Sequence, residues 1–315
     1  MSKLTYIKLL NKTLEYYLKG EFEIGYNYIS KNKDKVKGNR AQIYNFQYTL
    51  ACKLGNIEKG MELLKEAVYE KGYWYASDYL QEDDDLQELR SLEEFNNILK
   101  ICKKREKEAK ANVDPELEIY FPIEYSDDKT PLFISVHGNQ ENINIVKNYW
   151  GDVTQYNYIL ALPQSSQIEF SDAYDWNDLD KGASEIKEHY NNIKGNYLID
   201  KEDIIMGGFS AGVRVILETI KKRYIEPQGL ILMAPWIPEI EKRIEIFDLI
   251  KELNTKLYIL CGDNDKDCFE DCNMLVQKLE KYNIPYKYDV IENLDHDYPM
   301  DFKQKLKTAI DYIRS

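Results

Sequence analysis

The sequence is poor in the features that mark membrane-spanning and secreted chains. No part of its 315 residues approaches the roughly eighteen consecutive apolar positions that a membrane-spanning helix needs. The cysteines are odd in number and include no C-x-x-C pair, which disfavours a disulfide scaffold. The first residues, MSKLTYIKLLNKTLEYY, lack a long apolar core followed by a small-residue cleavage site, so no secretory signal is expected. These absences predict a cytoplasmic protein without a membrane span.

Motifs for nucleotides and metals are also missing. The chain has no G-x-G-x-x-G and no P-loop lysine, so a nucleotide cofactor is not indicated. Asp263-Asn-Asp-Lys-Asp267 begins like a calcium loop, but Cys268 stands where glycine is required and Met274 where glutamate is required. No cluster of histidine and cysteine completes a zinc site. We therefore expect neither a metal nor an organic cofactor.

Positive charge is scarce in the later two-thirds of the chain. The net charge is −13; residues 1–112 hold 20 Lys and Arg against 18 Asp and Glu, whereas the remainder holds 22 against 37. Such an excess of carboxylates repels nucleic acid and anionic membrane surfaces, so no nucleic-acid partner is expected. It also disfavours strongly anionic substrates, unless a local cluster of cations reverses the field.

One short segment carries a nucleophile motif. Residues 201–212 read KEDIIMGGFSAG and place Ser210 in G-x-S-x-G, directly after an apolar stretch, Ile204–Met206. A strand, this motif and a following helix are typical of a sharp turn that exposes the serine hydroxyl. Glycines flank the serine because a Cβ there would clash with the neighbouring strand and helix.

A serine is reactive at neutral pH only beside a base. The chain has three histidines, and His296 follows a strand-like run, Tyr286–Ile291, and precedes an amphipathic helix predicted over 301–313. His296 is therefore the expected base. His137 is then expected to be structural, and His189 to be a solvated side chain on a polar helix.

The base in turn needs an acid to orient it. The predicted strand Lys256–Cys261 is followed by Asp263, Asp265 and Asp267. Open α/β sheets build their sites from loops at the carboxyl ends of strands, so any of these carboxylates could meet the histidine. Pattern alone leaves the three open.

Four segments resemble the motif positions of α/β-hydrolases. They are VHGN (136–139), GFSAG (208–212), GDND (262–265) and LDHDYP (294–299). From about residue 115 to residue 315, the chain is similar to the predicted-esterase or phospholipase/carboxylesterase branch, which also resembles dienelactone hydrolases. The resemblance implies the α/β-hydrolase fold, a mostly parallel, doubly wound sheet.

The same resemblance implies a catalytic triad. Ser210 would be the nucleophile, His296 the general base and Asp265 the orienting acid, because the family usually places its acid three residues after a glycine. Many relatives carry glycine before the histidine, whereas this chain has Asp295. An additional carboxylate beside the imidazole would raise the pKa of His296.

The oxyanion hole needs two backbone N–H groups that point at the developing negative charge. Ala211, directly after the nucleophile, is expected to supply one. The loop after the predicted strand Leu132–Val136 is expected to supply the other, from Asn139 first and Gln140 next. The candidates for lining the substrate pocket are Gln140, Tyr174, Trp176 and Trp236.

The first third of the chain contains a repeat. KGEFEIG (19–25) and LGNIEKG (54–60) place their glycines 35 residues apart, and Ile29 aligns with Leu64. A period near 34 residues with small residues at the turn resembles tetratricopeptide-like helical hairpins.

This repeat predicts a separate helical domain. We expect hairpins over about 4–32 and 41–71 and a third helical element over 86–100. The predicted domains are a tetratricopeptide-like helical domain, 1–111, and an α/β-hydrolase domain, 112–315. Because two repeats are too few for a free-standing array, the helices are expected to cap the catalytic domain or to serve a protein partner or self-association.

Together these features predict a serine hydrolase that cleaves a carboxylic ester, or a related acyl bond, of a small-molecule substrate. Two alternatives stay open. One is a serine peptidase of the prolyl-oligopeptidase type, which shares the order Ser, Asp, His. The other is a non-catalytic hydrolase-fold scaffold with a protein-interaction module.

Overall fold

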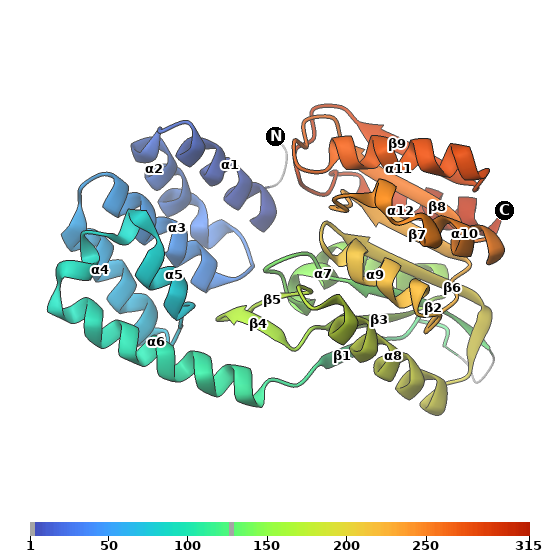
Figure 1. Ribbon diagram of the computed structural model, residues 1–315, viewed down its shortest axis with the longest axis horizontal. Helices are drawn as coiled ribbons and strands as arrows, with labels where there is room; N and C mark the ends of the chain where they lie inside the picture. The colour runs from blue at the N-terminus through green and yellow to red at the C-terminus, as the bar shows by residue number, and fades with distance from the viewer. Residues whose placement is uncertain (1–3, 126–128) are drawn as a thin grey trace. The chain divides into compact units, whose positions relative to one another are not determined.

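The computed structural model describes residues 4–125 and 129–315, and the chain forms two compact units (Figure 1). The first unit holds the chain up to Val113 together with Ile168–Ala173, and the second holds Asp114–Gln167 and the chain from Tyr174 onward. The main boundary thus lies two residues beyond the one expected from the sequence.

Helices build the first unit. They are α1 (Tyr6–Leu18), α2 (Phe22–Asn32), α3 (Arg40–Lys53), α4 (Ile57–Lys65), α5 (Ser77–Glu82) and α6 (Glu93–Asn112), with the shorter turns η1 (Lys33–Lys35), η2 (Glu66–Glu70), η3 (Asp84–Leu86) and η4 (Leu89–Ser91). Side-chain oxygens of Thr5, Asn39 and Asn56 accept backbone N–H groups at the starts of α1, α3 and α4. Such caps fix where each helix begins.

The sequence repeat corresponds to two helical hairpins. Gly20 and Gly55 have φ values of 74° and 72° and make the turns between α1 and α2 and between α3 and α4. Ile29 and Leu64, one on each second helix, are fully buried. The repeat therefore marks equivalent turns and equivalent core positions, while the tetratricopeptide resemblance itself stays a prediction.

The charged stretch after the predicted third helix continues that helix rather than ending it. The element expected over 86–100 begins at Glu93 and runs to Asn112 as α6. Lys110 contacts Glu106 at 2.7 Å, an i,i+4 ion pair that supports an exposed helix.

A hairpin from the second half of the sequence completes the helical unit. The strands β4 (Gln167–Phe170) and β5 (Ala173–Asp175) pair with each other. Ser171, at the tip, exchanges hydrogen bonds with Trp74: its Oγ accepts the Trp74 N–H at 2.7 Å, and its own N–H donates to the Trp74 carbonyl at 3.1 Å. Phe170 stacks on Tyr75 at 6.2 Å. The sequence placed this segment in the hydrolase domain, because nothing local marks a contact with residues a hundred positions earlier.

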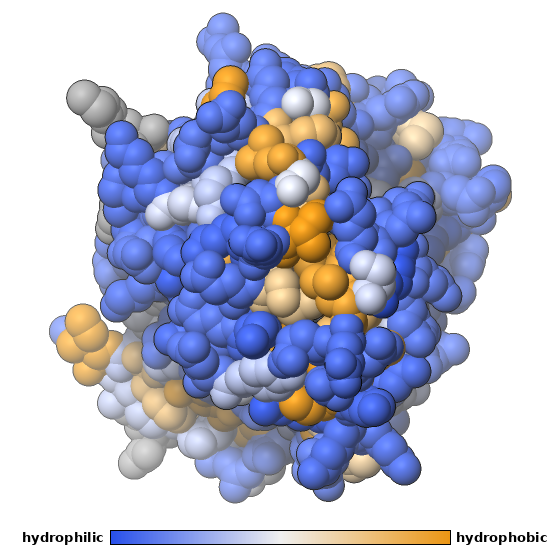
Figure 2. All heavy atoms as spheres, turned by 90° about the vertical axis from the view of Figure 1, so that its left-hand side faces the viewer, coloured by the Kyte–Doolittle hydropathy of each residue, from blue (hydrophilic) through white to orange (hydrophobic). Residues whose placement is uncertain are grey.

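A groove of about 540 Å³ lies on the helical unit beside α4, and its walls include Ile57, Met61, Tyr69 and Leu92. Figure 2, which faces this unit, shows a band of hydrophobic residues among hydrophilic ones. The predicted surface for a partner or for self-association stays a prediction.

The second unit is built on a mostly parallel sheet. Among the described residues seven strands pair in the order β1-β3-β2-β6-β7-β8-β9, and β1 alone runs antiparallel to its neighbour (Figure 1). The strands are β1 (Glu116–Tyr120), β2 (Thr130–Val136), β3 (Ile159–Gln164), β6 (Ile199–Phe209), β7 (Gly229–Met233), β8 (Lys256–Gly262) and β9 (Tyr286–Ile291). This arrangement confirms the predicted doubly wound α/β fold.

Helices cover both faces of the sheet. They are α7 (Ile143–Trp150), α8 (Leu179–Asn196), α9 (Gly212–Lys221), α10 (Ile244–Glu252), α11 (Phe269–Tyr282) and α12 (Phe302–Arg314), with the turns η5 (Gly151–Tyr156) and η6 (Ile240–Lys242). Side chains alternate along β2. Leu132 and Ile134 join the core that contains α8 to α11, and Phe133 packs on Trp150 of α7.

The strand order indicates which edge of the sheet carries a binding site. From β2 the chain passes outward to β3, on whose far side the earlier strand β1 pairs, and from β6 it builds in the opposite direction to β7, β8 and β9. The strand order therefore reverses between β2 and β6, and in open α/β sheets ligands bind beyond the carboxyl ends of the strands at such a point. The loops that begin at His137 and Ser210 both start there.

Within the described ranges, no helix has both the length and the apolar character that crossing a membrane demands.

Candidate active site

Ser210 occupies the sharp turn between β6 and α9. Its φ is 51°, in the left-handed region that residues with a side chain seldom adopt. Its N–H donates to the Met233 carbonyl at 3.0 Å, and its carbonyl accepts the Trp236 N–H at 3.2 Å. A Cβ on Gly212 would overlap the His137 carbonyl oxygen, so glycine is required where the start of α9 packs against the loop after β2. The strained turn is thus held from both sides.

His296 lies on the loop after β9 and faces the serine. Its Nε2 is 2.9 Å from the Ser210 Oγ, and its Nδ1 is 2.7 Å from the Asp265 Oδ2. The Phe209 ring packs against the imidazole with centroids 4.8 Å apart. The His296 side chain keeps 25% of its surface exposed, whereas that of Asp265 is fully buried. The three side chains form a continuous hydrogen-bonded series that can accept a proton from the serine.

Among the acids that the sequence left open, Asp265 is the one in contact with the imidazole. Its Oδ1 accepts the N–H groups of Asp267 and Cys268 at 3.2 and 3.0 Å, which leaves Oδ2 for the histidine. The Asp263 carboxylate instead accepts the N–H of Asn293 at 2.7 Å. Asp263 therefore ties the acid loop to the histidine loop.

The surroundings of His296 make it a stronger base. Burial alone would lower the pKa of His296, but the hydrogen bond and the charge of Asp265, with the charges of Asp267 and Glu141, raise it above its ordinary value. Asp295, which the sequence suggested as a source of such a shift, is exposed. A raised pKa favours proton transfer from the serine but requires a higher pH to free the base.

The loop after β2 offers donors for an oxyanion. The N–H of Gly138 already donates to the Glu141 carboxylate at 2.8 Å. The neighbouring N–H groups are those of Asn139, which is exposed, and of Gln140, whose φ of 56° turns the loop. Ala211 is the N-cap residue of α9, where N–H groups have no acceptor within the helix. The structure thus places both expected loops at the same edge of the sheet as the serine.

Glu141 is a buried acid beside this loop that sequence reasoning missed. It is 6% exposed, and its backbone carbonyl accepts the Tyr174 N–H at 3.2 Å. Burial raises the pKa of Glu141 to about 7; the Gly138 N–H and the charge of His296 oppose the rise, and Asp297 adds to it. Glutamate after a polar loop is usually exposed, so no local signal predicts its burial.

His137 and Trp176 support the loop from the core. The His137 Nδ1–H donates to the Gly138 carbonyl at 2.8 Å, and its Nε2 accepts the Ser165 N–H at 3.3 Å. Burial lowers the pKa of His137 to about 4. Trp176 is 2% exposed and donates from Nε1 to the His137 carbonyl at 3.0 Å. The prediction that Trp176 lines the substrate pocket is therefore wrong, because its ring is part of the core.

The other pocket candidates are partly exposed. Trp236 follows β7, is 38% exposed, and its backbone N–H donates to the Ser210 carbonyl. Tyr174 is half-buried and bonded to Glu141, and Gln140 lies on the oxyanion loop. The role of these three side chains in a substrate pocket stays a prediction.

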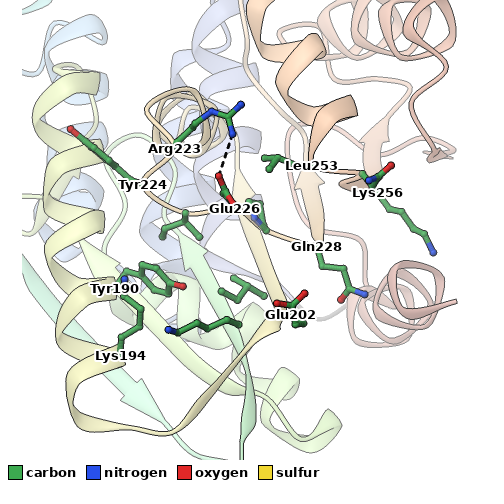
Figure 3. Close-up of a pocket in the computed structure, with 14 residues that line it drawn as sticks. Tyr190, Lys194, Glu202, Arg223, Tyr224, Glu226, Gln228, Leu253 and Lys256 are labelled. Carbon is green, nitrogen blue, oxygen red and sulfur yellow. Dashed lines mark hydrogen bonds and ion pairs between the residues drawn. The ribbon is translucent and has the colours of Figure 1, made fainter.

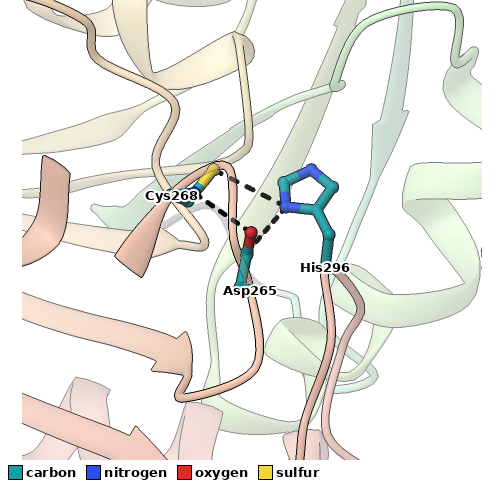
Figure 4. Close-up of side chains that lie close together, drawn as sticks. All are labelled: Asp265, Cys268 and His296. Carbon is teal, nitrogen blue, oxygen red and sulfur yellow. Dashed lines mark hydrogen bonds and ion pairs between the residues drawn. The ribbon is translucent and has the colours of Figure 1, made fainter. Parts of the chain in front are cut away.

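Cys268 adds a thiol to the acid and the base. Its Sγ is 3.6 Å from the His296 Nδ1, and Figure 4 shows it beside Asp265 and the imidazole. One potential ligand atom from each of the three residues lies within 4.8 Å of the others. Cysteine, histidine and aspartate are residue types that bind zinc in proteins. A cation bound there would replace the hydrogen bond that orients the imidazole. Burial also raises the pKa of the Cys268 thiol, which opposes a thiolate ligand.

The prediction that His189 is solvated is wrong. Its side chain is half-buried on α8, and its Nε2 is shielded from solvent without a hydrogen-bond partner among the described residues. Burial lowers the pKa of His189. His189 lies on α8 and makes no hydrogen bond to Ser210, His296 or Asp265.

A cavity of about 690 Å³ lies elsewhere on this unit. Figure 3 shows that Glu202, Gln228 and Lys256, at the amino ends of β6, β7 and β8, contribute to its wall with Tyr190 and Arg223. Ser210 follows the carboxyl end of β6. The cavity is therefore at the opposite edge of the sheet and contains no member of the triad.

Comparison with known proteins places these features in a family. The family model described as "A/B hydrolase-like, N-terminal domain" matches residues 5–110. An uncharacterized protein from Bacillus cereus ATCC 10987 is 46% identical over 99% of this chain and 100% of its own, with a TM-score of 0.58. A search of curated proteins found no match.

More distant structures share the fold of the second unit. Esterase PE8 is 16% identical over 64% of this chain and 99% of its own, with a TM-score of 0.51. A Bacillus cereus carboxylesterase is 17% identical over 66% of this chain and 98% of its own, with a TM-score of 0.50. At full-length coverage and 46% identity, this chain belongs to the same family as the Bacillus cereus ATCC 10987 protein, an α/β-hydrolase family with this helical N-terminal domain.

Proposed function

We propose that the protein is a serine hydrolase that cleaves a carboxylic ester, or a related acyl bond, through an acyl-enzyme. The observation that carries the proposal is the series Ser210–His296–Asp265, with separations of 2.9 and 2.7 Å. Each residue comes from a different loop at the carboxyl edge of one sheet. Such a series activates a serine that would otherwise be a weak nucleophile.

The first step forms the acyl-enzyme. The Ser210 Oγ attacks the carbonyl carbon, and its proton passes to the His296 Nε2. Asp265 accepts the Nδ1–H, which fixes the tautomer that leaves Nε2 free as a base, and its charge stabilises the imidazolium. When the tetrahedral intermediate collapses, Nε2–H protonates the leaving alcohol oxygen.

The second step releases the acid. Water takes the place of the alcohol, gives a proton to the His296 Nε2 and attacks the acyl carbon; the proton then returns to the Ser210 Oγ. In both steps the oxyanion would accept hydrogen bonds from the N–H groups of Ala211 and Asn139. Removing one such donor from a hydrolase lowers kcat by about 10²–10³-fold.

An ester is the substrate bond that we favour over an amide. The names of the two distant structures, an esterase and a carboxylesterase, are in keeping with this choice. The alternatives differ in measurable ways, because a peptidase would cleave aminoacyl arylamides and a scaffold would cleave neither class.

The proposal is tested by labelling and hydrolysis. A fluorophosphonate probe should label wild-type protein and the Ser184→Ala control, whose serine lies on α8, but not Ser210→Ala. The same three proteins are then assayed on p-nitrophenyl esters from acetate to palmitate. Absence of labelling in the wild type would refute the proposal, and labelling with cleavage of arylamides alone would replace the esterase by a peptidase.

A further inference from the structure

Arg214 and Arg243 differ from the other arginines of the chain. The guanidinium groups that donate to carboxylates or backbone carbonyls are those of Arg40, Arg90, Arg105, Arg223 and Arg314. Within residues 4–125 and 129–315, those of Arg214 and Arg243 have no hydrogen bond and no ion pair. An arginine head group normally finds an acceptor, since a shielded N–H without one is unfavourable.

Arg214 lies one helical turn from the nucleophile. Its backbone N–H donates to the carbonyl of Ala211, the residue after Ser210, at 3.0 Å in the first turn of α9. Its guanidinium lies over the Trp236 ring, 5.0 Å from the ring centroid. Because the backbone N–H of Trp236 donates to the Ser210 carbonyl, Trp236 connects this cation to the turn that holds Ser210.

The charge of Arg214 is incompletely balanced. Its Nε is shielded from solvent and has no acceptor among the described residues. Burial lowers the pKa of Arg214, the charge of Arg243 lowers it further, and the charge of Asp175 raises it. The positive charge of Arg243 thus acts on Arg214, and both arginines belong to the acidic part of the chain.

The nearby carboxylates are engaged elsewhere. Both oxygens of Asp175 accept hydrogen bonds from Asn177, at 2.9 and 2.6 Å. Glu218, one turn after Arg214 on α9, pairs with Lys222 at 3.7 Å. None of the described acids lies within ion-pair distance, 4.0 Å, of Arg214. The terminal N–H groups of the guanidinium therefore have no acceptor among the described residues, which leaves them for a group from outside the chain.

We propose that Arg214, with Trp236 beside it and the charge of Arg243 nearby, binds a carboxylate of the substrate close to the scissile acyl bond. This rests on the proposed function, because it names the substrate class of the Ser210 site. The fork of a guanidinium matches the two oxygens of a carboxylate, and the aromatic face shields the pair from water. A singly charged carboxylate suits an acidic domain better than a doubly charged phosphate does. Here the local cations reverse the field that disfavours anionic substrates.

The test compares charged and neutral esters of equal size. Mono-p-nitrophenyl glutarate against p-nitrophenyl valerate places the carboxylate on the acyl side, and acetoxybenzoate against tolyl acetate, with a methyl group in place of the carboxylate, places it on the alcohol side. The measured quantity is the ratio of kcat/KM, charged over neutral. The proteins are wild type, Arg214→Met, Arg214→Lys and Arg223→Met, whose arginine follows the C-terminal end of α9 and serves as the control.

We expect wild type to prefer the charged ester in one of the two pairs. Arg214→Met should lower that ratio at least about tenfold, the range for a hydrogen bond to a charged group, and Arg214→Lys should lower it less. Arg223→Met should leave the ratio unchanged, because its guanidinium pairs with Glu252 far from the nucleophile. Equal ratios in wild type and Arg214→Met, for both pairs, would overturn the inference.

Two further measurements separate this inference from the proposed function. If fluorophosphonate labels Ser210 and neutral esters are cleaved without any charge preference, the hydrolase stands and the carboxylate site is wrong. If Ser210 is not labelled, calorimetric titration of glutarate into wild type and Arg214→Met decides the site alone: binding lost in the variant supports it, and equal or absent binding refutes it. Should Arg214→Met fail to fold by circular dichroism, Arg243→Met and Arg214→Lys give the same comparison.

Discussion

The carboxylate of Glu141 accepts the backbone N–H of Gly138 at 2.8 Å. This bond closes the loop on which the second proposed oxyanion donor lies. A buried acid that is not one of the proposed reacting groups therefore helps to hold the loop in shape. The negative charge of Glu141 also raises the pKa of His296, and the charge of His296 in return lowers that of Glu141. The loop and the base are therefore coupled through one carboxyl group.

Replacing Glu141 by glutamine tests this coupling. The amide oxygen can still accept the Gly138 N–H, but the charge that raises the pKa of His296 is gone. The acid limb of the kcat/KM profile should move to lower pH, measured on one neutral ester between pH 5 and 9. An acid limb at the same pH as in the wild type would show that the charge of Glu141 does not affect His296 and that Glu141 acts only through its hydrogen bond to the loop. Glu141→Ala, which leaves the N–H unpaired, should also lower the free energy of unfolding by about 1–3 kcal/mol.

The pH dependence of the wild type follows from the raised pKa of His296. A general base must be unprotonated, so activity should rise with pH and reach half its maximum above the ordinary histidine value of 6.5. The same shift stabilises the folded state at low pH, fully below 6.5, and this contribution is lost as pH rises through the folded pKa. Stopped assays of kcat/KM across the range check the first statement. A midpoint below 6.5 would contradict it.

The choice among the three aspartates is tested by matched amides. Asp265→Asn should lower kcat by about 10³-fold or more, because the amide no longer holds the imidazole in the tautomer that accepts the serine proton. Asp267→Asn and Asp263→Asn should each lose less than about tenfold, since neither side chain contacts the imidazole. An Asp267→Asn variant as impaired as Asp265→Asn would argue against the assignment.

The close approach of the acid and histidine loops depends on Gly262. A Cβ there would overlap the carbonyl oxygen of Leu294, two residues before the base. Gly262→Ala should lower the free energy of unfolding by about 1–3 kcal/mol and reduce kcat, because the two loops must separate. Gly195→Ala, on α8 with open space around the new methyl group, is the control and should stabilise by up to about 1 kcal/mol. Urea unfolding and ester hydrolysis report the two effects.

Ser171 tests the contribution of the hairpin to the helical unit. Ser171→Ala removes the acceptor of the buried Trp74 N–H and should lower the free energy of unfolding by about 1–3 kcal/mol. Ser91→Ala removes an exposed hydroxyl that bonds Glu88 and should change it by less than about 0.5 kcal/mol. Equal effects of the two substitutions, measured by chemical denaturation, would mean that the hairpin does not stabilise this unit.

Local rules explain what the sequence predicted well. A nucleophile turn needs a strand, closely spaced glycines and a helix in one short segment, so Ser210 is recognisable from its neighbours. His296 follows because the chain has few histidines and the fold orders its loops. The helical hairpins are equally local, since Gly20 and Gly55 mark turns at equivalent positions.

By itself, then, the sequence determined the fold class and the loops that carry the reactive groups, because strand, turn and helix signals act over a few residues. The tertiary structure alone decided which aspartate meets the imidazole, that Glu141 and Trp176 are buried, and that Ser171 belongs with the helices. It also left Arg214 without an acceptor among the described residues. Each of these depends on contacts between residues that are far apart in the chain. Such contacts produce no local sequence pattern from which they could be predicted.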